Sequence, residues 1–387
     1  TLLDSLRSLS DHGHTGVTAK DAYTLGNGQV AVKVLPKRLM DHLLVAGFKG
    51  EVRLMPNLKE ETWLNHCAHV YKNPPSEGKV SLVLGAGNVA SIGLLDVIHK
   101  LYVEAQVCLL KFNPVNEYLE PHYRSTLKPL IEAGYVRLIK GEAEEGKYLC
   151  QHELVDEIHI TGSDRTHDAI VYGTGEEGAQ RKANDEPLCT KRVSSELGNV
   201  SPVIIVPGSW TQRQIKFHAE NIATMMYNNV GFNCNAARVL IMQKDWPQKR
   251  ALLNALREVL SSLEARPSYY PGAVDRHKRF IESHDGAELI ATQSLDGTEG
   301  ALPIGLVVEV DPNDIDHTCF REEAFCAMTA TTSLETSDAQ SFLKAATKFA
   351  NEVLWGTLNA TIIIDPQTEK TFKKSLEKAL DELKYGS

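Results

Sequence analysis

Residues 80–111, with the sequence VSLVLGAGNVASIGLLDVIHKLYVEAQVCLLK, contain the pattern that decides the fold. Val80–Leu84 is an apolar run that predicts a buried strand, and it leads into a turn at residues 85–87 (GAG). Residues 94–101 predict a helix, and Val107–Lys111 predicts a second strand. A strand, a glycine turn, a helix and another strand together form one parallel crossover unit.

The same alternation continues along the chain, so the sequence predicts an α/β protein with parallel sheets. Residues 123–133 predict a helix that stops at Gly134. Two more helices are predicted at residues 211–228, with Thr211 as the N-cap, and at residues 248–264. Further strands are predicted at residues 136–139, 157–160, 202–206, 237–241, 306–310, 327–332 and 361–364.

Composition restricts the classes of protein that fit. The chain has 387 residues, is 42% hydrophobic and carries a formal net charge of −9, so it can bury a large core but lacks the basic surface that nucleic acid requires. No apolar stretch is long enough for a membrane span. The seven cysteines include no CxxC pair, which favours a reducing compartment, and we expect a cytoplasmic protein without a metal site.

Five short segments, taken in order, resemble the aldehyde dehydrogenase superfamily. They are KFNP at residues 111–114, ITGS at 160–163, ELGNVSP at 196–202, GFNC at 231–234 and EEAF at 322–325. Each segment alone is a weak signal, but all five stand in the order that the family has. The chain is therefore identified as an atypical or truncated member of this superfamily.

The resemblance implies two doubly wound, three-layer α/β/α domains. Residues 1–199 would form a Rossmann-like cofactor domain, in which residues 1–78 match no part of the family that we can assign. Residues 200–387 would form the catalytic domain, with the boundary between Gly198 and Ser201. Family members continue well beyond Glu323, whereas only 64 residues follow it here, so we expect this sequence to be a fragment of a longer protein.

The resemblance assigns the nucleophile to Cys234. Oxidation of an aldehyde by hydride loss proceeds through a tetrahedral adduct, and a thiolate is a good group to form it. An isolated cysteine is more often a small buried hydrophobic residue. Within GFNCNAARVLI and downstream of ELGNVSP, however, the catalytic interpretation of Cys234 is the stronger one.

Two further catalytic roles follow from the resemblance. Asn88 would donate its side-chain amide to the oxyanion of the adduct, although Gly87 stands where the family has tryptophan. Glu196 would be the general base that activates water to hydrolyse the thioester. Relatives that pass the acyl group to coenzyme A commonly lack this glutamate, so its presence favours release of a free carboxylate. The bland alternatives are a turn asparagine and an exposed glutamate at a strand end.

Cofactor contacts are also carried over from the family. Lys111 and Asn113 would lie beside the adenosine ribose, while Gly162, Ser163 and Gly198 would lie along the dinucleotide, whose pyrophosphate favours a helix N-terminus. The family places a glutamate that holds the nicotinamide ribose, and an aromatic residue near it, where this chain has Glu323 and Phe325. Pro114 replaces the glutamate with which many NAD-using members bind the ribose hydroxyls, which leaves the choice between NAD and NADP open.

Four alternatives to this function remain at the level of sequence, and one of them is a family member with only a binding or structural role. A reductive acylating enzyme of the same family would reduce acyl-CoA or another activated acyl group to the aldehyde. An ordinary Rossmann NADP reductase would use the loop from Gly85 to Gly87, which fits the GxGxxA fingerprint, but it leaves Glu196 and Cys234 unexplained. A thiol hydrolase would need a histidine beside Cys234, and no histidine lies in such a motif.

The expected partner is a small aldehyde, with no nucleic acid and no membrane. Family members commonly pair subunits, so a homodimer is an oligomeric state that the resemblance allows. The identity of the aldehyde is not encoded in any motif that we can assign.

Overall fold

The computed structural model describes residues 2–56, 58 and 62–387. The chain divides into two compact units. One comprises Thr1–Lys79 together with Ile98–Val107, and the other comprises Val80–Val97 together with Cys108–Ser387. The second unit holds both large sheets and all ten residues to which the sequence assigns a role.

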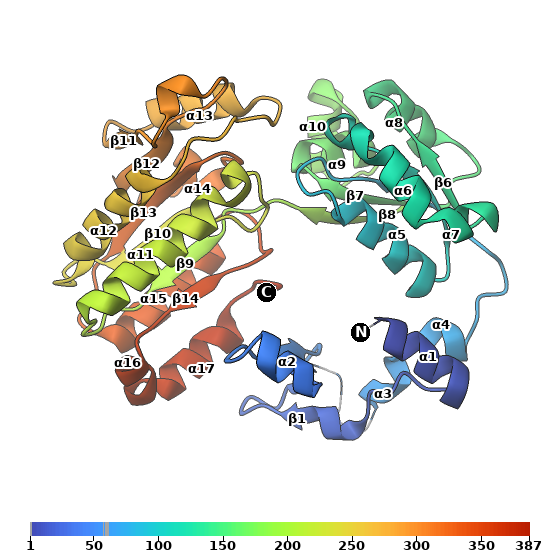
Figure 1. Ribbon diagram of the computed structural model, residues 1–387, viewed down its shortest axis with the longest axis horizontal. Helices are drawn as coiled ribbons and strands as arrows, with labels where there is room; N and C mark the ends of the chain where they lie inside the picture. Colours follow the sequence, from blue (N-terminus) through green and yellow to red (C-terminus); the bar gives the residue numbers. More distant parts are fainter. Residues whose placement is uncertain (1, 57, 59–61) are drawn as a thin grey trace. The chain divides into compact units, whose positions relative to one another are not determined.

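The first unit is built on a small antiparallel sheet with the order β1-β2-β3 (Figure 1). Val30, Val32 and Trp63 form its small core. Its elements are α1 (Leu2–His12), η1 (Ala19–Asp21), β1 (Ala22–Thr24), β2 (Val30–Leu35), α2 (Leu39–Leu44), β3 (Gly50–Arg53), α3 (Trp63–His66) and α4 (His69–Lys72). These residues correspond to the part of the sequence that no family pattern explains.

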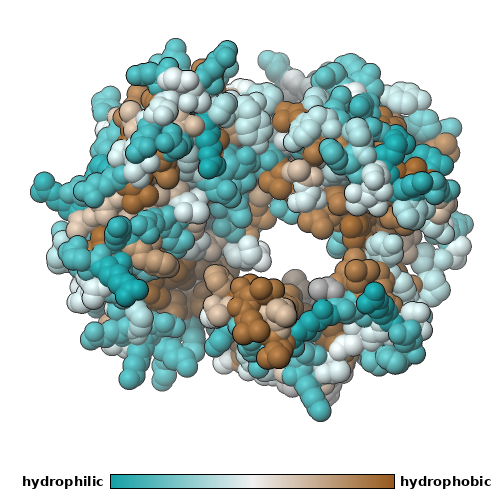
Figure 2. All heavy atoms as spheres, in the orientation of Figure 1, coloured by the Kyte–Doolittle hydropathy of each residue, from teal (hydrophilic) through white to brown (hydrophobic). Residues whose placement is uncertain are grey.

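Helix α2 of this unit carries apolar side chains on its surface. The exposed fractions of Leu39, Leu43 and Leu44 are 80%, 69% and 76%. Figure 2 shows apolar surface where α2 lies in Figure 1. No residue of α2 is buried, so the helix has no face packed against a core.

The first sheet of the second unit has five strands in the order β6-β5-β4-β7-β8. The pairs β4–β7, β5–β6 and β7–β8 are parallel. Three strands coincide with the predicted ranges, β7 runs two residues further than predicted, and β8 was not predicted. The bounds are β4 (Val80–Leu84), β5 (Val107–Lys111), β6 (Val136–Ile139), β7 (Glu157–Gly162) and β8 (Arg192–Leu197).

One predicted helix of this sheet is interrupted. Residues 123–133 contain parts of two helices that meet at Leu127, because Pro129 has no N–H for a helix to continue through and is placed in the first turn of the second one. Gly134 ends the pair with φ of +85°, as predicted for a helix stop. The helices around this sheet are α5 (Ile92–Tyr102), η2 (Pro114–Leu119), α6 (Glu120–Thr126), α7 (Lys128–Glu132), α8 (Ala143–Gln151), α9 (Asp164–Val171) and α10 (Gly175–Ala183).

The second sheet has six strands in the order β11-β12-β13-β10-β9-β14. All its pairs are parallel except β11–β12, so the sheet is mixed at one edge rather than fully parallel. The antiparallel strand β11 was not predicted. The bounds are β9 (Pro202–Ile205), β10 (Val239–Gln243), β11 (Ala287–Ile290), β12 (Ile304–Val310), β13 (Met328–Leu334) and β14 (Thr361–Ile363).

Helices cover this sheet in two layers (Figure 1). Helices α11 and α12 pack side by side, and α15 packs with α17. The predicted N-cap is confirmed, because the Thr211 hydroxyl accepts from the Gln214 N–H at 3.2 Å. The helical elements are α11 (Gln212–Tyr227), η3 (Asn228–Gly231), α12 (Lys249–Ser262), α13 (Ala273–Glu282), η4 (Leu295–Gly297), α14 (Thr318–Arg321), α15 (Ala339–Glu352), α16 (Pro366–Thr371) and α17 (Lys373–Glu382).

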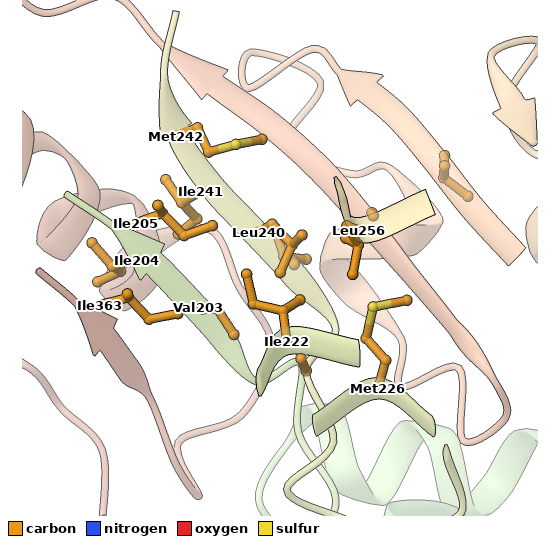
Figure 3. Packing of buried hydrophobic residues seen from close by; sticks show 14 of the residues in the cluster. Val203, Ile204, Ile205, Ile222, Met226, Leu240, Ile241, Met242, Leu256 and Ile363 are labelled. Atoms are coloured by element: carbon orange, nitrogen blue, oxygen red, sulfur yellow. The ribbon is translucent and has the colours of Figure 1, made fainter. Parts of the chain in front are cut away.

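The main core lies around the central strands of this second sheet. Ile204, Leu240, Ile222 and Leu256 are all fully buried, and Figure 3 shows side chains of β9 and β10 packed near those of α11 and α12. Strands covered on both faces carry continuous apolar runs, which explains why β9 and β10 were predicted from sequence. Each such side chain contributes about 1.5–3 kcal/mol on burial, so this core stabilises the sheet that carries the Cys234 loop.

The chain passes from the first sheet to the second between Leu197 and Pro202, where the sequence predicted a boundary. This crossing is buried and hydrogen-bonded. The Val200 N–H donates to the Trp355 carbonyl at 2.8 Å, and the Ser201 hydroxyl lies 2.7 Å from Asn359 Oδ1. The Ser201 hydroxyl also lies 3.4 Å from the Cys234 carbonyl, so the segment that follows β8 is bonded to the loop that follows α11.

Candidate active site

One cleft of about 1380 Å³ lies at the carboxyl ends of β4 and β7. These two strands are neighbours, and the strand order of the five-stranded sheet reverses between them. In doubly wound sheets, ligands bind in the crevice at this reversal point. The fold therefore provides a binding cleft at the position where the glycine turn of residues 85–87 follows β4.

All ten residues that the sequence singled out line this cleft. They are Asn88, Lys111, Asn113, Gly162, Ser163, Glu196, Gly198, Cys234, Glu323 and Phe325. They come from both sheets of the second unit and are separated by up to 237 positions in the chain. The structure therefore brings the ten residues together in one cleft, while the role of each residue stays a prediction.

The loop that carries Cys234 has an unusual backbone. Asn229 and Val230 lie in the left-handed region, with φ of 52° and 55°, and Gly231 follows with φ of 75°. A Cβ on Gly231 would lie 2.3 Å from the Cys326 carbonyl oxygen, so only glycine fits there. Strained residues of this kind persist where the surrounding structure holds them, and they often occur at functional sites.

Arg238 binds the backbone of this loop. Its side chain is 3% exposed, and its two terminal nitrogens donate to the carbonyls of Cys326 at 2.7 Å and Gly231 at 2.6 Å. A third, longer bond reaches the Asn233 carbonyl at 3.3 Å. The planar guanidinium suits several carbonyls at once, so Arg238 fixes the strained turn against the segment that carries Glu323.

The thiol of Cys234 faces the carboxylate of Glu196. The Sγ–Oε1 distance is 3.9 Å, which is within reach of a weak S–H···O hydrogen bond. Glu196 lies near the end of β8, paired with Thr161 of β7, and its side chain is exposed to the cleft. Burial raises the pKa of Cys234 to about 11, and the charges of Glu196 and Glu323 add to this rise. Cys234 is therefore a protonated thiol at neutral pH.

This electrostatic arrangement predicts how fast Cys234 reacts with iodoacetamide. Only the thiolate is alkylated, so the rate should rise about tenfold per pH unit between pH 7 and 10. Replacing Glu196 by glutamine removes a negative charge and lowers the pKa of Cys234, so at any pH in this range alkylation should become about three- to tenfold faster. Mass spectrometry of the Cys234 peptide measures the rate of alkylation. A slower reaction in the Glu196 variant would show that this carboxylate deprotonates the thiol instead of opposing its charge.

Asn88 is tied to the nucleophile loop. Its side-chain amide donates to the Phe232 carbonyl at 3.0 Å, and its own carbonyl accepts from the Asn229 side chain at 2.9 Å. The hydroxyl of Tyr269 donates to the same carbonyl at 3.2 Å. One amide hydrogen of Asn88 thus positions the loop, and the second is the one that an oxyanion on a Cys234 adduct would receive.

Two of the predicted cofactor residues follow β5. Lys111 is 7% exposed, and in the described part of the chain its ammonium makes no hydrogen bond or ion pair; burial lowers its pKa. Asn113 has a structural task, since its Oδ1 accepts from the Val115 N–H at 3.1 Å. The Asn113 side chain also packs against Gly87, where a Cβ would approach Oδ1 to 2.6 Å. Any side chain at position 87 would therefore have to displace Asn113.

Gly162 and Ser163 form the turn from β7 into α9. Ser163 is the N-cap of that helix, and its hydroxyl accepts from the Thr166 N–H at 3.2 Å. The first N–H groups of α9 therefore open toward the cleft end of the sheet. Such a helix start favours a negatively charged group.

Glu323 is packed directly against Gly198. A Cβ at Gly198 would lie 1.9 Å from Glu323 Oε2, whereas Oε1 is buried and has no hydrogen-bond partner among the described residues. Burial raises the pKa of Glu323 to about 7, although Arg238 and Arg276 oppose this rise. A carboxylate with one orphaned oxygen in a cleft needs a donor, such as a hydroxyl, from outside the protein.

Phe325 belongs to an aromatic cluster beside the nucleophile loop. Its ring centroid lies 5.0 Å from that of Tyr270 and 5.9 Å from that of Phe232. Arg276 donates to the carbonyls of Ala324 and Phe325 at 3.2 and 3.3 Å and fixes this segment. Phe325 itself has a φ of 41°.

Sequence reasoning did not find Arg238, Arg276 or Tyr270. Arg238 left a visible signal, because an arginine between AA and VLIM at the start of a buried strand must find partners for its charge. Arg276 and Tyr270 gave none, since each lies in a polar segment whose position relative to the cleft only the fold determines.

Three further observations concern the cysteines, metal binding and membrane-spanning helices. All seven cysteines lie among the described residues and are free. Within residues 2–56, 58 and 62–387, no group of His, Cys, Asp and Glu side chains is arranged to hold a metal ion. No helix in that part of the chain has the length and apolar character that a bilayer crossing needs.

Comparison with solved structures supports the predicted fold. The chain is similar to 3,6-anhydro-L-galactose dehydrogenase (15% identity, TM-score 0.60, covering 80% of this chain and 62% of that one). It is also similar to the NADP-dependent glyceraldehyde-3-phosphate dehydrogenase of Bacillus halodurans, solved with NADP (17%, 0.60, 80% and 60%). A third similar structure is indole-3-acetaldehyde dehydrogenase with NAD+ (20%, 0.58, 80% and 59%).

The predicted fold class, with two doubly wound α/β sheets of the aldehyde dehydrogenase kind, is thus confirmed. The chain spans about three fifths of the length of these solved relatives. The family described as "Aldehyde dehydrogenase family" matches residues 127–352, which include Glu196, Cys234 and Glu323. The match covers more than half of the sequence, and the chain belongs to the aldehyde dehydrogenase family.

Proposed function

We propose that the protein oxidises an aldehyde to a carboxylate with NAD or NADP, using Cys234 as the nucleophile. The observation that carries this proposal is the pairing of the Cys234 thiol with the Glu196 carboxylate at 3.9 Å, inside the cleft at the strand-order reversal. A nucleophile and an acid–base group within reach of each other, in a cleft suited to a dinucleotide, are what this chemistry requires. The family match adds weight to the same function.

The cleft fits a dinucleotide on three observations. Among the described residues, Glu323 Oε1 is a buried acceptor without a donor, and Lys111, a residue 7% exposed that lines the cleft, has no acceptor for its ammonium. Glycines stand where backbone must approach closely, as at Gly87 and Gly198. Eight Lys and Arg side chains and seven carboxylates line the cleft, in a chain whose net charge is −9, so the cleft is much less acidic than the protein as a whole. Solved relatives with NADP and with NAD+ support the same cofactor class.

The proposed reaction begins when Cys234 loses its proton to solvent and its sulfur bonds to the aldehyde carbon. The carbonyl oxygen becomes an oxyanion, which the free amide hydrogen of Asn88 and the backbone N–H at Cys234 stabilise. A bound nicotinamide supplies the acceptor for the hydride that leaves this carbon. Glu196 then takes a proton from water, the water oxygen attacks the thioester, and the carboxylate leaves as the Cys234 thiol re-forms.

The test is to incubate the protein with a panel of short, long and aromatic aldehydes and to follow reduction of NAD and of NADP. Aldehyde-dependent reduction supports the oxidative function and identifies the cofactor. Silence with every aldehyde, followed by oxidation of reduced cofactor when acyl-CoA is supplied, would instead establish the reductive acylating alternative. An ordinary Rossmann reductase would reduce or oxidise its substrate without any dependence on Cys234.

Replacing Glu196 by glutamine separates the two halves of the proposed reaction. Hydride transfer should survive, so a pre-steady-state burst of reduced cofactor close to one per active site is expected. Steady-state turnover should fall by about 10²–10⁴-fold, because thioester hydrolysis loses its base. Stopped-flow absorbance measures both phases. An unchanged steady-state rate would remove Glu196 from the mechanism, and Glu177→Gln, a carboxylate elsewhere in the same cleft, is the matched control.

A further inference from the structure

The end of β5 and the turn after β6 bring one lysine and three carboxylates together. Lys111 pairs with Ile139 in the register of the two strands, and the Phe112 N–H donates to the Ile139 carbonyl at 2.9 Å. The turn at Gly141 and Glu142 follows two residues later. The lysine at the end of one strand therefore lies beside the turn that leaves the next strand.

Two of the carboxylates are fixed by backbone hydrogen bonds in this turn. Glu117 Oε1 accepts from the Gly141 N–H at 2.7 Å, and Glu145 Oε2 accepts from the Glu142 N–H at 2.8 Å. The Glu145 stem packs so closely on Gly141 that a Cβ there would lie 2.7 Å from its Cγ. These bonds hold the turn in place and keep two negative charges at it.

Glu142 is the member of this group that faces the cleft. It lines the same cavity as Lys111 and Pro114, while Glu117 and Glu145 do not. Lys111 is 7% exposed, it lines the cleft, and its ammonium makes no hydrogen bond or ion pair among the described residues, so the ammonium is available to a ligand in the cleft. The charges of Glu142, Glu117 and Glu145, in this order, oppose the fall that burial causes in the pKa of Lys111.

In doubly wound dinucleotide sites, the side chain after the second strand of the sheet recognises the adenosine ribose. A carboxylate there accepts from the 2′-hydroxyl of NAD, whereas an arginine accommodates the 2′-phosphate of NADP. Here β5 is the second strand of the crossover unit. It ends at Lys111, and Pro114 lies three residues later. The acidic partner of the ribose must then come from a neighbouring element, and Glu142 is placed for it.

We infer that Glu142 makes the protein selective for NAD over NADP, by accepting a hydrogen bond from the 2′-hydroxyl beside Lys111 and by repelling a 2′-phosphate. This inference rests on the proposed dinucleotide site. Three carboxylates act on the single charge of Lys111, so a phosphate with nearly two negative charges meets more repulsion at this point than a hydroxyl does. In this protein the acidic residue for the ribose, Glu142, lies in the turn after β6 and not at the end of β5.

The experiment is direct binding of NADH and of NADPH, by titration calorimetry or by the change in nicotinamide fluorescence. The unmodified protein should bind NADH at least about tenfold more tightly than NADPH. Glu142→Gln should weaken NADH binding by about tenfold, the scale of one hydrogen bond to a charged group, and should narrow the preference. Glu142→Arg should reverse the preference. Thermal unfolding of each variant checks that the fold is retained.

Glu144→Gln is the matched control, because Glu144 lines the same cleft two residues beyond Glu142 but is not among the carboxylates whose charges act on Lys111. It should leave the ratio of the two affinities unchanged. Equal binding of NADPH, or an equal shift of the ratio in the Glu142 and Glu144 variants, would overturn the inference while the proposed function stands. If neither reduced cofactor binds, the proposed function fails as well.

Discussion

Replacing Cys234 by alanine is expected to abolish aldehyde-dependent cofactor reduction, with turnover reduced by at least about 10⁴-fold. The charged groups that act on Cys234 are the carboxylates of Glu196 and Glu323, and a carboxylate is a weaker nucleophile toward an aldehyde than a thiolate. The variant should still fold, since Cys234 is only half-buried and its side chain is not part of the main core.

The measurement is steady-state cofactor reduction with the best aldehyde from the panel, together with binding of NADH to the same variant. NADH binding should be retained, because the predicted contacts to the dinucleotide lie on other residues. Cys67→Ala is the control, since Cys67 is also a half-buried free thiol but lies in the first unit. Residual turnover within tenfold of the unmodified protein would exclude Cys234 as the nucleophile.

The second large effect is expected from Arg238→Ala, on stability rather than on chemistry. The guanidinium is 3% exposed and satisfies the carbonyls of Cys326, Gly231 and Asn233. Alanine would leave these carbonyls buried without donors and would open a cavity, at a cost of about 3–5 kcal/mol in the free energy of unfolding. Loss of the bonds also frees the strained turn, so aldehyde turnover should fall even at temperatures where the variant is folded.

Urea unfolding followed by circular dichroism measures this cost, and Arg257→Ala provides the comparison. Arg257 forms a two-pronged ion pair with Glu288 at 2.8 Å on a partly exposed surface, and its loss should cost no more than about 1 kcal/mol. Arg238→Lys should recover only part of the lost stability, because a single ammonium cannot reach acceptors in two directions. Similar losses for the alanine variants of Arg238 and Arg257 would show that Arg238 does not hold the loop.

Strands buried on both faces were predictable, and half-exposed ones were not. The runs VSLVL, VCLLK and PVII gave β4, β5 and β9 nearly to the residue, because a continuous apolar stretch between turn residues has few other uses. Strand β8 has the sequence RVSSEL and is largely exposed or half-buried, so its backbone pairing with β7 determines it rather than its side chains. The antiparallel strand β11 was missed for the same reason.

The candidate site divides in a similar way. Motif order placed the ten residues that line the cleft, because short segments around a nucleophile and a dinucleotide tolerate little change in sequence. The groups that act through charge or packing at a distance, such as Arg276 and Glu142, could not be found, since their relation to Cys234 or Lys111 exists only after the sheets have formed. Arg238 stands between these cases, with a visible signal that the motif search did not use.

The buried crossing between the two sheets has a consequence for recombination. Position 200 looks like a natural joint at which halves of related proteins could be exchanged. In space, however, Asn199 and Ser201 bond to Asn359, and Val200 bonds to the carbonyl of Trp355, so the joint is built from both sides of the proposed cut. A chimera crossed over at residue 200 would combine Asn199 of one parent with Asn359 of the other, and this polar set would have to be inherited together for the nucleophile to stay in line with the base.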